Sequence, residues 1–326
     1  MVGKLTPNNL MSASRIPQLL GLSPYATQNQ LLSEMIDHDQ GKAPEPWEGN
    51  ELTYWGNVHE GAIITRAAEL LGLTDVEVDI NEPYFHAKLP LAASLDGRAV
   101  GTGIVRNDPS RGIFVRDGEY LQLDGKTVVI EAKSTQAQPE DTPPPWRGPF
   151  QLQAQMMCAE ADYGIVAVLY RGSELRVWLY QADLATQSNI SAAITDFETR
   201  RVKKDWYPLA NPEDGNVAFR NVDDGAPPLQ IIKDFVVQNG EVQDAIEVLV
   251  EAKRLKKECE QSIADAETVI KEYMGNHEEA RTVVDGTDTI IKWPMRNTRA
   301  RPEKITPAKP AERVRQNTLT IKELKQ

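Results

Sequence analysis

The chain has 326 residues and a mass of 36.3 kDa, with two cysteines, four histidines and a net charge of −12. The two cysteines lie about a hundred positions apart, which excludes a disulfide framework and a CxxC metal site and favours a reducing, cytoplasmic compartment. The longest strongly apolar stretch, residues 165–170, is far shorter than the ~20 residues that span a bilayer, so no membrane is expected.

The charge is unevenly distributed along the chain. Residues 281–326 hold 11 Lys or Arg and 5 Asp or Glu, a net of +6, so the preceding part is strongly acidic. An acidic protein is not coated with nucleic-acid-binding surface. Any contact with DNA is therefore expected in a local basic groove or tail.

The first 210 residues are typical of a mixed α/β domain and begin with two short helical patterns. A short helix capped by Ser14 is expected, with Pro17 in its first turn and Gly21 after its end. A second helix opens at Thr27, because Gln30 stands at the capping-box spacing of three. Its inward residues recur at helical spacing: Leu31, Leu32, Met35 and Ile36.

A third and longer helix is expected over residues 55–71, closed by Gly72. Its Glu60 shares a face with the apolar residues three, four, seven and eleven positions later. A carboxylate on the apolar side of a helix indicates a functional role. The alternative is a solvated residue near the helix start, where the macrodipole favours a negative charge.

Two strand patterns carry further charged residues. Residues 91–97 alternate and place Asp96 at a strand end, and residues 126–130 form a continuous β-branched run typical of a central strand. In the following segment, Glu131 and Lys133 point to one face because they are two positions apart. Buried charges are costly unless they have a partner of opposite charge or a bound cation. The carboxylates of Asp96 and Glu131 suit Mg²⁺, and Lys133 can orient or activate a water molecule. The alternative is an ion pair where the strand emerges into solvent.

Residues 136–149 contain five prolines and are expected to form an exposed loop. A helix over residues 150–161 and a hairpin of residues 164–170 and 175–180 follow. Gln151 and Gln155 lie one turn apart on that helix, either beside the charged strand or on an ordinary solvent face.

The C-terminal part differs in composition. A domain over residues 1–210 is expected to end in a linker over residues 211–228, which is rich in Asn, Asp, Gly and Pro. Residues 229–280 form a long helical segment with a coiled-coil-like stripe, and residues 281–326 a basic extension with a short strand near Trp293. The helix either packs on the first domain or forms an intermolecular coiled coil, and Trp293 belongs to a core or serves as an anchor.

Five segments, in order, resemble the phage lambda-type exonucleases and YqaJ-like viral recombinases of the PD-(D/E)xK nuclease superfamily: SASRIPQLLGLSPY, WGNVHEGA, AASLDG, VIEAKST and QLQAQM. The resemblance spans about residues 10–180. It implies an α/β fold with a restriction-endonuclease-like core, in which helices flank a central mixed β-sheet. The long helix would then be a C-terminal extension of that core.

The resemblance also implies roles for individual residues. The implied metal ligands are three carboxylates and one carbonyl: Glu60, Asp96, Glu131 and Ala132. Lys133 would position or deprotonate the attacking water, and Gln151 would orient the lysine or the scissile phosphate. The implied contacts to DNA phosphate are Ser12, Ser14 and Gln153. Lambda-type members carry an arginine several residues before the serine pair, near the place of Pro7 here, so dependence on a 5′-phosphate stays open.

The function implied is a Mg²⁺-dependent 5′→3′ exonuclease on double-stranded DNA ends, with Mn²⁺ as a substitute ion. Its 3′ overhangs would serve phage recombination by single-strand annealing, in the host bacterial cytoplasm. The partners implied are DNA ends, a single-strand annealing protein and further copies of the chain, a ring-like trimer among them. The alternatives are another PD-(D/E)xK nuclease, either an endonuclease or a single-strand exonuclease, and a non-catalytic DNA-binding or assembly protein.

Overall fold

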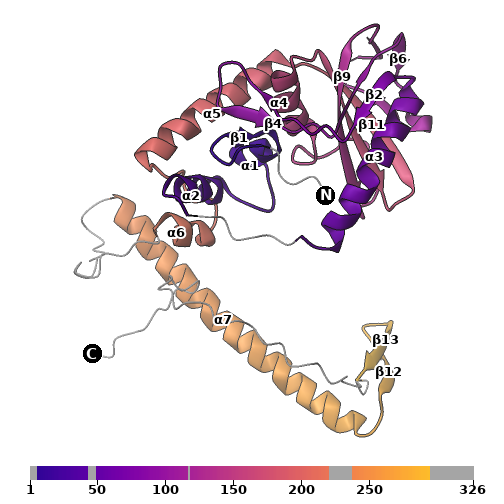
Figure 1. The fold of residues 1–326 in the computed structure, drawn as a ribbon. Helices are drawn as coiled ribbons and strands as arrows, with labels where there is room; N and C mark the ends of the chain where they lie inside the picture. Colours follow the sequence, from indigo (N-terminus) through magenta and orange to yellow (C-terminus); the bar gives the residue numbers. More distant parts are fainter. Residues whose placement is uncertain (1–5, 43–48, 117, 220–236, 294–326) are drawn as a thin grey trace. The chain divides into compact units, whose positions relative to one another are not determined.

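The computed structural model describes residues 6–42, 49–116, 118–219 and 237–293 (Figure 1). The chain divides into two compact units, residues 1–220 and 221–326, and each is described by itself. The first unit is mixed α/β, and the described part of the second is a long helix followed by a β-hairpin. The α/β class and the C-terminal long helix predicted from the sequence are thereby confirmed.

A mixed six-stranded sheet forms the centre of the first unit. Its strands stand in the order β2 (Thr74–Val78), β5 (Gly97–Val100), β9 (Thr127–Thr135), β10 (Tyr163–Tyr170), β11 (Glu174–Gln181) and β7 (Ile113–Val115). β9 is parallel to β10 and antiparallel to β5, and β10 forms the predicted hairpin with β11. The β-branched run therefore lies in a central strand, as expected for a segment that is apolar on both faces.

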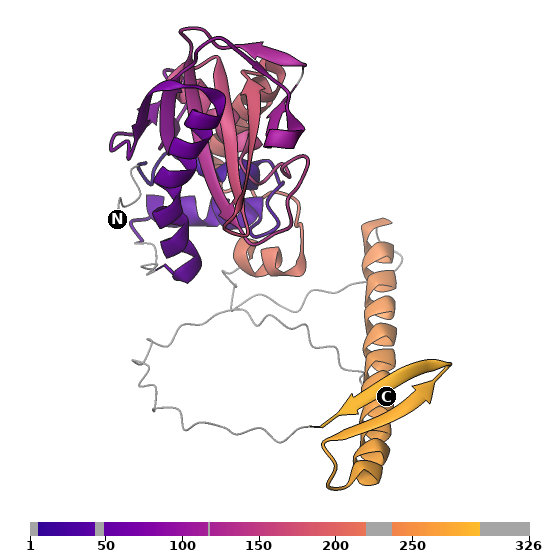
Figure 2. The same cartoon turned by 90° about the vertical axis from the view of Figure 1, so that its right-hand side faces the viewer.

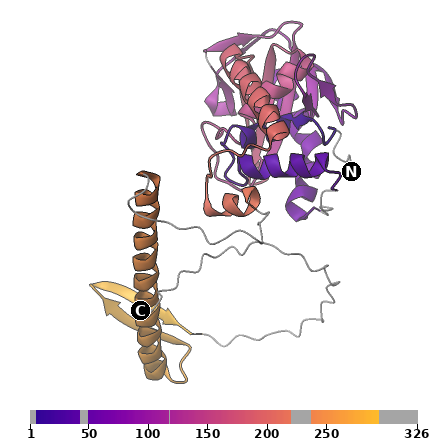
Figure 3. The ribbon, with the colours of Figure 1, turned by 90° about the vertical axis from the view of Figure 1, so that its left-hand side faces the viewer.

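Helices cover both faces of this sheet. The helical elements of the first unit are η1 (Ala13–Arg15), α1 (Ile16–Leu19), α2 (Gln28–Asp39), α3 (Glu51–Leu71), η2 (Pro109–Arg111), α4 (Pro149–Ala159), α5 (Leu184–Lys203) and α6 (Pro212–Ala218). α3 covers one face, where Ile63 joins Val128 and Ile130 of β9 in one apolar core (Figure 2). α4 and α5 cover the other face, where Leu152 joins Val129 in a second core (Figure 3).

A second sheet ties the N-terminal segment to the first unit. It holds β1 (Met11–Ser12), β4 (Leu91–Ala93) and β3 (Tyr84–Phe85), with β4 in the middle. The helix expected near Ser14 is present, but the prediction that Ser14 caps it is wrong. Ser14 lies inside η1, and its hydroxyl is hydrogen-bonded to that of Ser12 at 2.9 Å. Ser12 stands at the N-cap position of η1.

The single strand expected over residues 91–97 is wrong, because two strands of different sheets occur there. β4 pairs with β1 and β3, whereas β5 joins the six-stranded sheet. A Cβ at Gly97 would lie 2.8 Å from a methyl group of Ile64, so only glycine lets β5 begin directly against α3. The break between the strands places Asp96 next to the central strand β9.

The stretch between β5 and β9 holds a separate two-stranded sheet. This sheet consists of β6 (Ile104–Arg106) and β8 (Tyr120–Gln122). Between them, β7 pairs in parallel with β11 at the edge of the large sheet. The long sequence separation of Asp96 and Glu131 is therefore an insertion that leaves β5 and β9 paired.

The proline-rich loop over residues 136–149 is bound to the hairpin β10–β11, contrary to the simple exposed loop expected. Buried aromatic side chains supply the donors: Tyr170 Oη donates to Glu140 at 3.0 Å, and Trp178 Nε1 to the carbonyl of Asp141 at 3.1 Å. The loop ends at Gly148, with φ of +111°, where a Cβ would lie 2.9 Å from Val166. The glycine thus lets α4 start in close contact with β10.

α2 begins at the predicted capping box. Thr27 Oγ1 accepts a hydrogen bond from Gln30 N at 3.2 Å, and Gln30 Oε1 accepts one from Thr27 N at 2.8 Å. All four side chains predicted to point inward from α2 are buried.

The linker predicted over residues 211–228 starts too early. Residues 212–218 form α6, which begins at the N-cap residue Asn211 and buries Asp214. The Asn, Asp and Pro residues that favoured a linker are therefore a helix cap and its first turn, which have the same composition. Residues 220–228 lie outside the described residues.

Asp214 holds α6 to α2, and we expect its loss to destabilise the first unit. Its carboxylate accepts hydrogen bonds from Thr27 Oγ1, from Asn29 Nδ2 at 3.3 Å and from Ala210 N at 2.8 Å. Asp214→Ala leaves these donors without an acceptor and should lower the free energy of unfolding by about 2–3 kcal/mol. Urea unfolding followed by tryptophan fluorescence measures the change. The exposed neighbour Glu213 serves as control, and the free energy of unfolding of Glu213→Ala should lie within about 0.5 kcal/mol of that of the parent. An equal loss of stability in the two variants would contradict the prediction.

The second unit contains α7 (Val237–Met274) and the hairpin β12 (Glu279–Val284) and β13 (Thr287–Lys292). Large apolar residues of the predicted stripe on α7 are exposed: Val242, Ile246, Leu255, Ile263 and Ile270. Trp293 is 46% exposed, with its ring centroid 6.0 Å from Lys271 Nζ, so it is not a core residue. Residues 294–326 of the predicted basic extension lie outside the described residues.

Candidate active site

Charged side chains meet where β5 begins and β9 continues past it. Glu131 and Lys133 are two residues apart on β9, so both leave the same face of the sheet, whereas Ala132 joins the core beneath α3. Glu131 is fully buried, Lys133 keeps 34% of its side chain exposed, and the two form an ion pair. The lysine therefore neutralises a buried carboxylate while its chain still reaches solvent.

Asp96 lies beside Glu131 because of how the strand ladder ends. β5 pairs with β9 as far as Gly97 opposite Ile130. Beyond that point the Ala132 N–H donates to Asp96 Oδ2 at 2.9 Å, in place of a further strand partner. A backbone group that needs an acceptor thus holds the carboxylate at the end of the ladder.

α3 adds a third carboxylate from the other face of the sheet. Burial, followed by the charge of Glu131, raises the pKa of the half-buried Glu60. The same two causes raise the pKa of Asp96 well above its usual range. Burial by itself lowers the pKa of Lys133, but the carboxylates of Glu131 and Asp96 outweigh it and raise that pKa. Three carboxylates and one ammonium group therefore form an electrostatically coupled cluster with an excess of negative charge.

Gln155 of α4 holds the buried carboxylate from the other side. Its Nε2 donates to Glu131 Oε2 at 2.5 Å and to the carbonyl of Ser94 at 3.1 Å, and its side chain is fully buried. The sequence pattern assigned the orienting role to Gln151, one turn earlier on the same face of α4, which is largely buried. The helical spacing of four between these glutamines is the signal that identifies Gln155 as a member of the site.

Gln153 lies away from this cluster, on the other side of α4. Its Nε2 donates to the carbonyl of Gln181 at 2.9 Å, and its Oε1 accepts from Asp183 N at 3.0 Å and from Gln187 Nε2 at 3.2 Å. These bonds join α4 to the end of β11 and the start of α5. We therefore correct the implied role of Gln153 from a phosphate contact to a structural contact.

Gln155 and Gln153, which are both buried on α4, form a matched pair for a test. Gln155→Ala should lower cleavage by about 10- to 100-fold, because a side chain that orients a metal-ligand candidate is removed. Both Gln155→Ala and Gln153→Ala should lose about 1–3 kcal/mol of stability, because each leaves buried partners unpaired. Cleavage rates measured beside urea unfolding separate the two effects. If Gln153→Ala lost as much activity, a purely structural role for Gln155 would be the better explanation.

The serine pair lies next to the strand that leads to the cluster. Ser12 of β1 is paired with Ala92 of β4, four residues before Asp96. Ser12 is buried and Ser14 is exposed. The structure thus brings the N-terminal segment to the polypeptide that carries Asp96.

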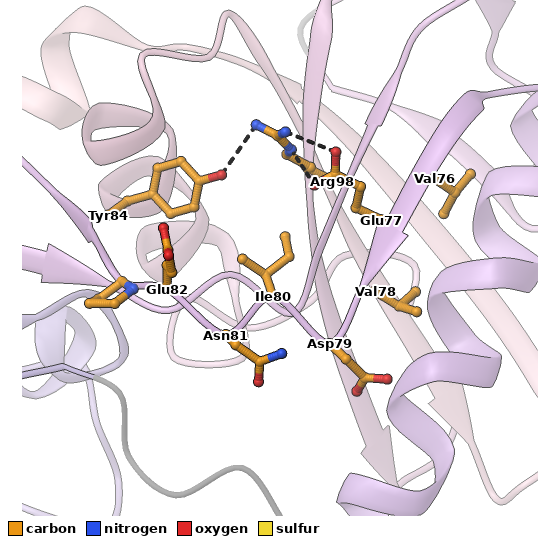
Figure 4. A pocket seen from close by; sticks show the side chains of 10 residues that line it. Val76, Glu77, Val78, Asp79, Ile80, Asn81, Glu82, Tyr84 and Arg98 are labelled. Atoms are coloured by element: carbon orange, nitrogen blue, oxygen red, sulfur yellow. Dashed lines mark hydrogen bonds and ion pairs between the residues drawn. The ribbon is translucent and has the colours of Figure 1, made fainter.

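A polar pocket opens beside the cluster, between the end of β2 and β3 (Figure 4). Arg98 donates two hydrogen bonds of 2.8 Å to Glu77 and one of 3.2 Å to Tyr84 Oη. Asp79 points away from this group in Figure 4, and its charge contributes to the raised pKa of Glu60. Asp79 of this pocket therefore acts electrostatically on Glu60 of the cluster.

The donor set fits a hard divalent cation. Carboxylate and carbonyl oxygens are the ligands that Mg²⁺ prefers, and the repulsion that raises the pKa of Asp96 is what a cation would relieve. Within the ranges that the structure describes, no three His, Cys, Asp or Glu side chains lie close enough together to bind one metal ion. Glu131 is instead paired with Lys133 and Gln155.

Comparison with known families identifies the first unit. The family model of the YqaJ-like viral recombinase domain matches residues 7–162. The chain carries a YqaJ-like viral recombinase domain. All the site residues named above from Ser12 to Gln155 lie inside this YqaJ-like domain. The resemblance inferred from the five sequence segments is thereby confirmed.

Solved structures similar to this chain include exonucleases by title. Two of them are structures of an alkaline exonuclease from Laribacter hongkongensis, which is 16% identical to this chain. The TM-score is 0.42 for the exonuclease alone and 0.43 for its complex with dAMP. Each match covers 60% of this chain and 89% of that protein. A phage-related exonuclease from Haemophilus somnus 129PT is 13% identical, with a TM-score of 0.36, and the match covers 60% of this chain and 98% of that one. No curated protein sequence is similar enough to count as a relative. Among the described residues, no helix has the length and apolar character needed to cross a membrane.

Proposed function

We propose that this chain is a Mg²⁺-dependent exonuclease that degrades double-stranded DNA from a 5′ end and leaves a 3′ single-stranded overhang. The observation that carries the proposal is the coupled cluster of Asp96, Glu131, Glu60 and Lys133 inside a YqaJ-like domain. Carboxylates buried together destabilise a fold, so their presence is best explained by a cation and a phosphodiester. The enzyme is thus a phosphodiester hydrolase.

In this proposal the acidic residues bind the cation and Lys133 acts on the attacking water. Glu60, Asp96 and Glu131, with the Ala132 carbonyl, are the proposed ligands. Mg²⁺, or Mn²⁺ in its place, would stabilise the charge that develops on the phosphate and lower the pKa of a bound water. Lys133 positions or deprotonates the attacking water with its Nζ, and Gln155 fixes the carboxylate of Glu131 through the bond described above.

Polar groups around the cluster are proposed to bind the DNA strand. Gln151 faces Lys133 or the scissile phosphate from the first turns of α4. Ser12 and Ser14 bind the terminal phosphate of the strand beside Asp96. These assignments rest on the resemblance and on the position of β1 next to β4.

Linear duplex DNA labelled separately at its 5′ and 3′ ends tests the proposal. With Mg²⁺, the full chain should release the 5′ label first and leave covalently closed circular DNA intact, and EDTA should stop the reaction. Cutting of the circle would favour an endonuclease, and digestion of single strands alone a single-strand exonuclease. Absence of cleavage by folded protein with Mg²⁺ and Mn²⁺ would favour a DNA-binding or assembly protein.

The overhang produced by this reaction is the substrate of single-strand annealing. We therefore propose an annealing protein as the partner and the cytoplasm of an infected bacterium as the place of action. A homo-oligomer, such as a ring-like trimer, would explain how an acidic chain handles DNA, because only the surface that faces the DNA needs to be basic.

A further inference from the structure

The first turns of α3 expose a row of aromatic rings that ends at the acidic cluster. Trp55 is 50% exposed and Tyr54 is 55% exposed. The Trp55 and His59 rings lie 5.9 Å apart, with 34° between their planes, and Tyr54 packs edge-on to Trp55 at 5.4 Å. We call Tyr54, Trp55 and His59 the α3 ring row.

The inner end of this row touches the strand that carries the proposed catalytic lysine. His59 Nδ1 and Ser134 Oγ lie 3.4 Å apart, and Ser134 directly follows Lys133. His59 also directly precedes Glu60 on α3. The ring row therefore contacts β9 at the residue next to the proposed catalytic lysine.

The distance along the helix matches the size of nucleotides. From Trp55 to Glu60, α3 rises by about 7.5 Å, which is the length of about two stacked nucleotides at ~3.4 Å each. This spacing along the helix axis is compatible with a phosphate at the cluster and a neighbouring base at Trp55. An exposed indole is well suited to this contact because every nucleobase has a flat π face.

The charges on this part of α3 favour a base over a phosphate. Residues 51–60 contain Glu51 and Glu60 and no Lys or Arg, and Trp55 Nε1 donates to Glu51 Oε2 at 3.2 Å. Anionic phosphates are repelled from such a surface, whereas a neutral ring is accepted. Bases inside a duplex hide both faces in the stack, so the surface is best suited to an unpaired base at a DNA end.

We propose that Trp55, supported by Tyr54 and His59, is a stacking site for an unpaired nucleobase next to the cleaved phosphodiester. This inference rests on the proposed function, since it places a DNA strand at Lys133. It predicts that the enzyme recognises the frayed or single-stranded end of its substrate by the faces of its bases.

Two single-stranded probes test the proposal without cleavage. One is an oligothymidylate of about twelve nucleotides, within the usual site sizes of single-strand binding proteins, and the other is an abasic strand with the same number of phosphates. Binding to the full chain is measured in EDTA. The parent protein should prefer the strand with bases by about tenfold, and Trp55→Ala should bind both strands equally. Trp55→Phe should keep most of the preference, because it keeps an aromatic face.

Leu52→Ala is the matched control, since Leu52 is a large apolar residue of the same helix and is 76% exposed. It should leave the preference unchanged. The proposal is overturned if Trp55→Ala keeps the parent's preference, if Leu52→Ala loses it equally, or if the parent binds both probes alike. A change in sedimentation size on Trp55→Ala with unchanged DNA binding would also overturn it and assign the surface to a second copy of the chain.

The binding test is separate from the test of the proposed function. If the parent protein prefers the strand with bases but does not cleave labelled duplex, the proposal of a stacking site stands and the proposal of nuclease activity is refuted. If the parent protein cleaves duplex DNA and Trp55→Ala keeps the preference for the strand with bases, only the proposal of a stacking site is refuted.

Discussion

Lys133→Ala should reduce the cleavage of linear duplex DNA by about 10²- to 10⁴-fold, the usual effect of removing a group that positions or transfers a proton at a reacting centre. The variant should also melt at a lower temperature than the parent, because the fully buried Glu131 loses the ammonium group that neutralises it. A loss of activity in this variant alone would therefore be ambiguous.

Lys133→Arg removes that ambiguity. The guanidinium retains the positive charge and can pair with Glu131, but its planar donors cannot reproduce the compact ammonium of lysine. Its melting temperature should return towards that of the parent while cleavage stays at least about 100-fold lower. Lys126→Ala, which removes an exposed lysine paired with Asp162 immediately before β9, should change neither quantity. Parent-like cleavage by Lys133→Arg would refute a specific role for the lysine.

Asp96→Asn should abolish activity and at the same time stabilise the fold. The folded state raises the pKa of this carboxyl, chiefly through burial and then through the charge of Glu131. A carboxyl whose pKa is raised on folding weakens the fold once the pH exceeds its unfolded pKa, because the folded state opposes ionisation. Near neutral pH the Asp96 carboxyl therefore lowers the stability of the fold. The amide of Asn removes this cost, while its oxygen can still accept the hydrogen bond from Ala132 N.

Two measurements decide this prediction. The melting temperature of Asp96→Asn at neutral pH should rise by about 2–4 °C for a gain of about 1 kcal/mol. Cleavage should fall by about 10³-fold or more, since losing a charged ligand costs about 4 kcal/mol or more of transition-state stabilisation. At a pH below the ordinary range of Asp the difference in melting temperature should vanish, because both states of Asp96 are then protonated. A destabilised Asp96→Asn variant would mean that Asp96 is a structural residue.

The sequence predicted those parts of the fold in which neighbouring residues decide the outcome. The capping box at Thr27, the central strand after Lys126 and the hairpin β10–β11 depend on residues a few positions apart, and all three are confirmed. Glu131 and Lys133 were correctly placed on one face for the same reason, since a strand alternates its side chains.

The errors arose where contacts distant in sequence overrule the local pattern. Residues 91–97 alternate as one strand would, but β4 and β5 pair with different neighbours, and the chain breaks between them. Residues 211–218 have the composition of a linker, but Asp214 finds buried donors on α2, almost two hundred residues earlier. Composition reports only the local preference, whereas these contacts depend on the whole fold.

The candidate site divides in the same way. The residue types and spacing of Asp96, Glu131 and Lys133 fitted either a metal site or an ion pair, because isolated buried charges are costly and carboxylates suit a hard cation. The resemblance of five sequence segments to a nuclease family favoured the metal site. Only the tertiary structure decided which other side chains join them. It added Gln155 as the residue bound to Glu131, because that contact depends on the packing of α4 on β9. Spacing determines which residues share a face, and packing determines what that face meets.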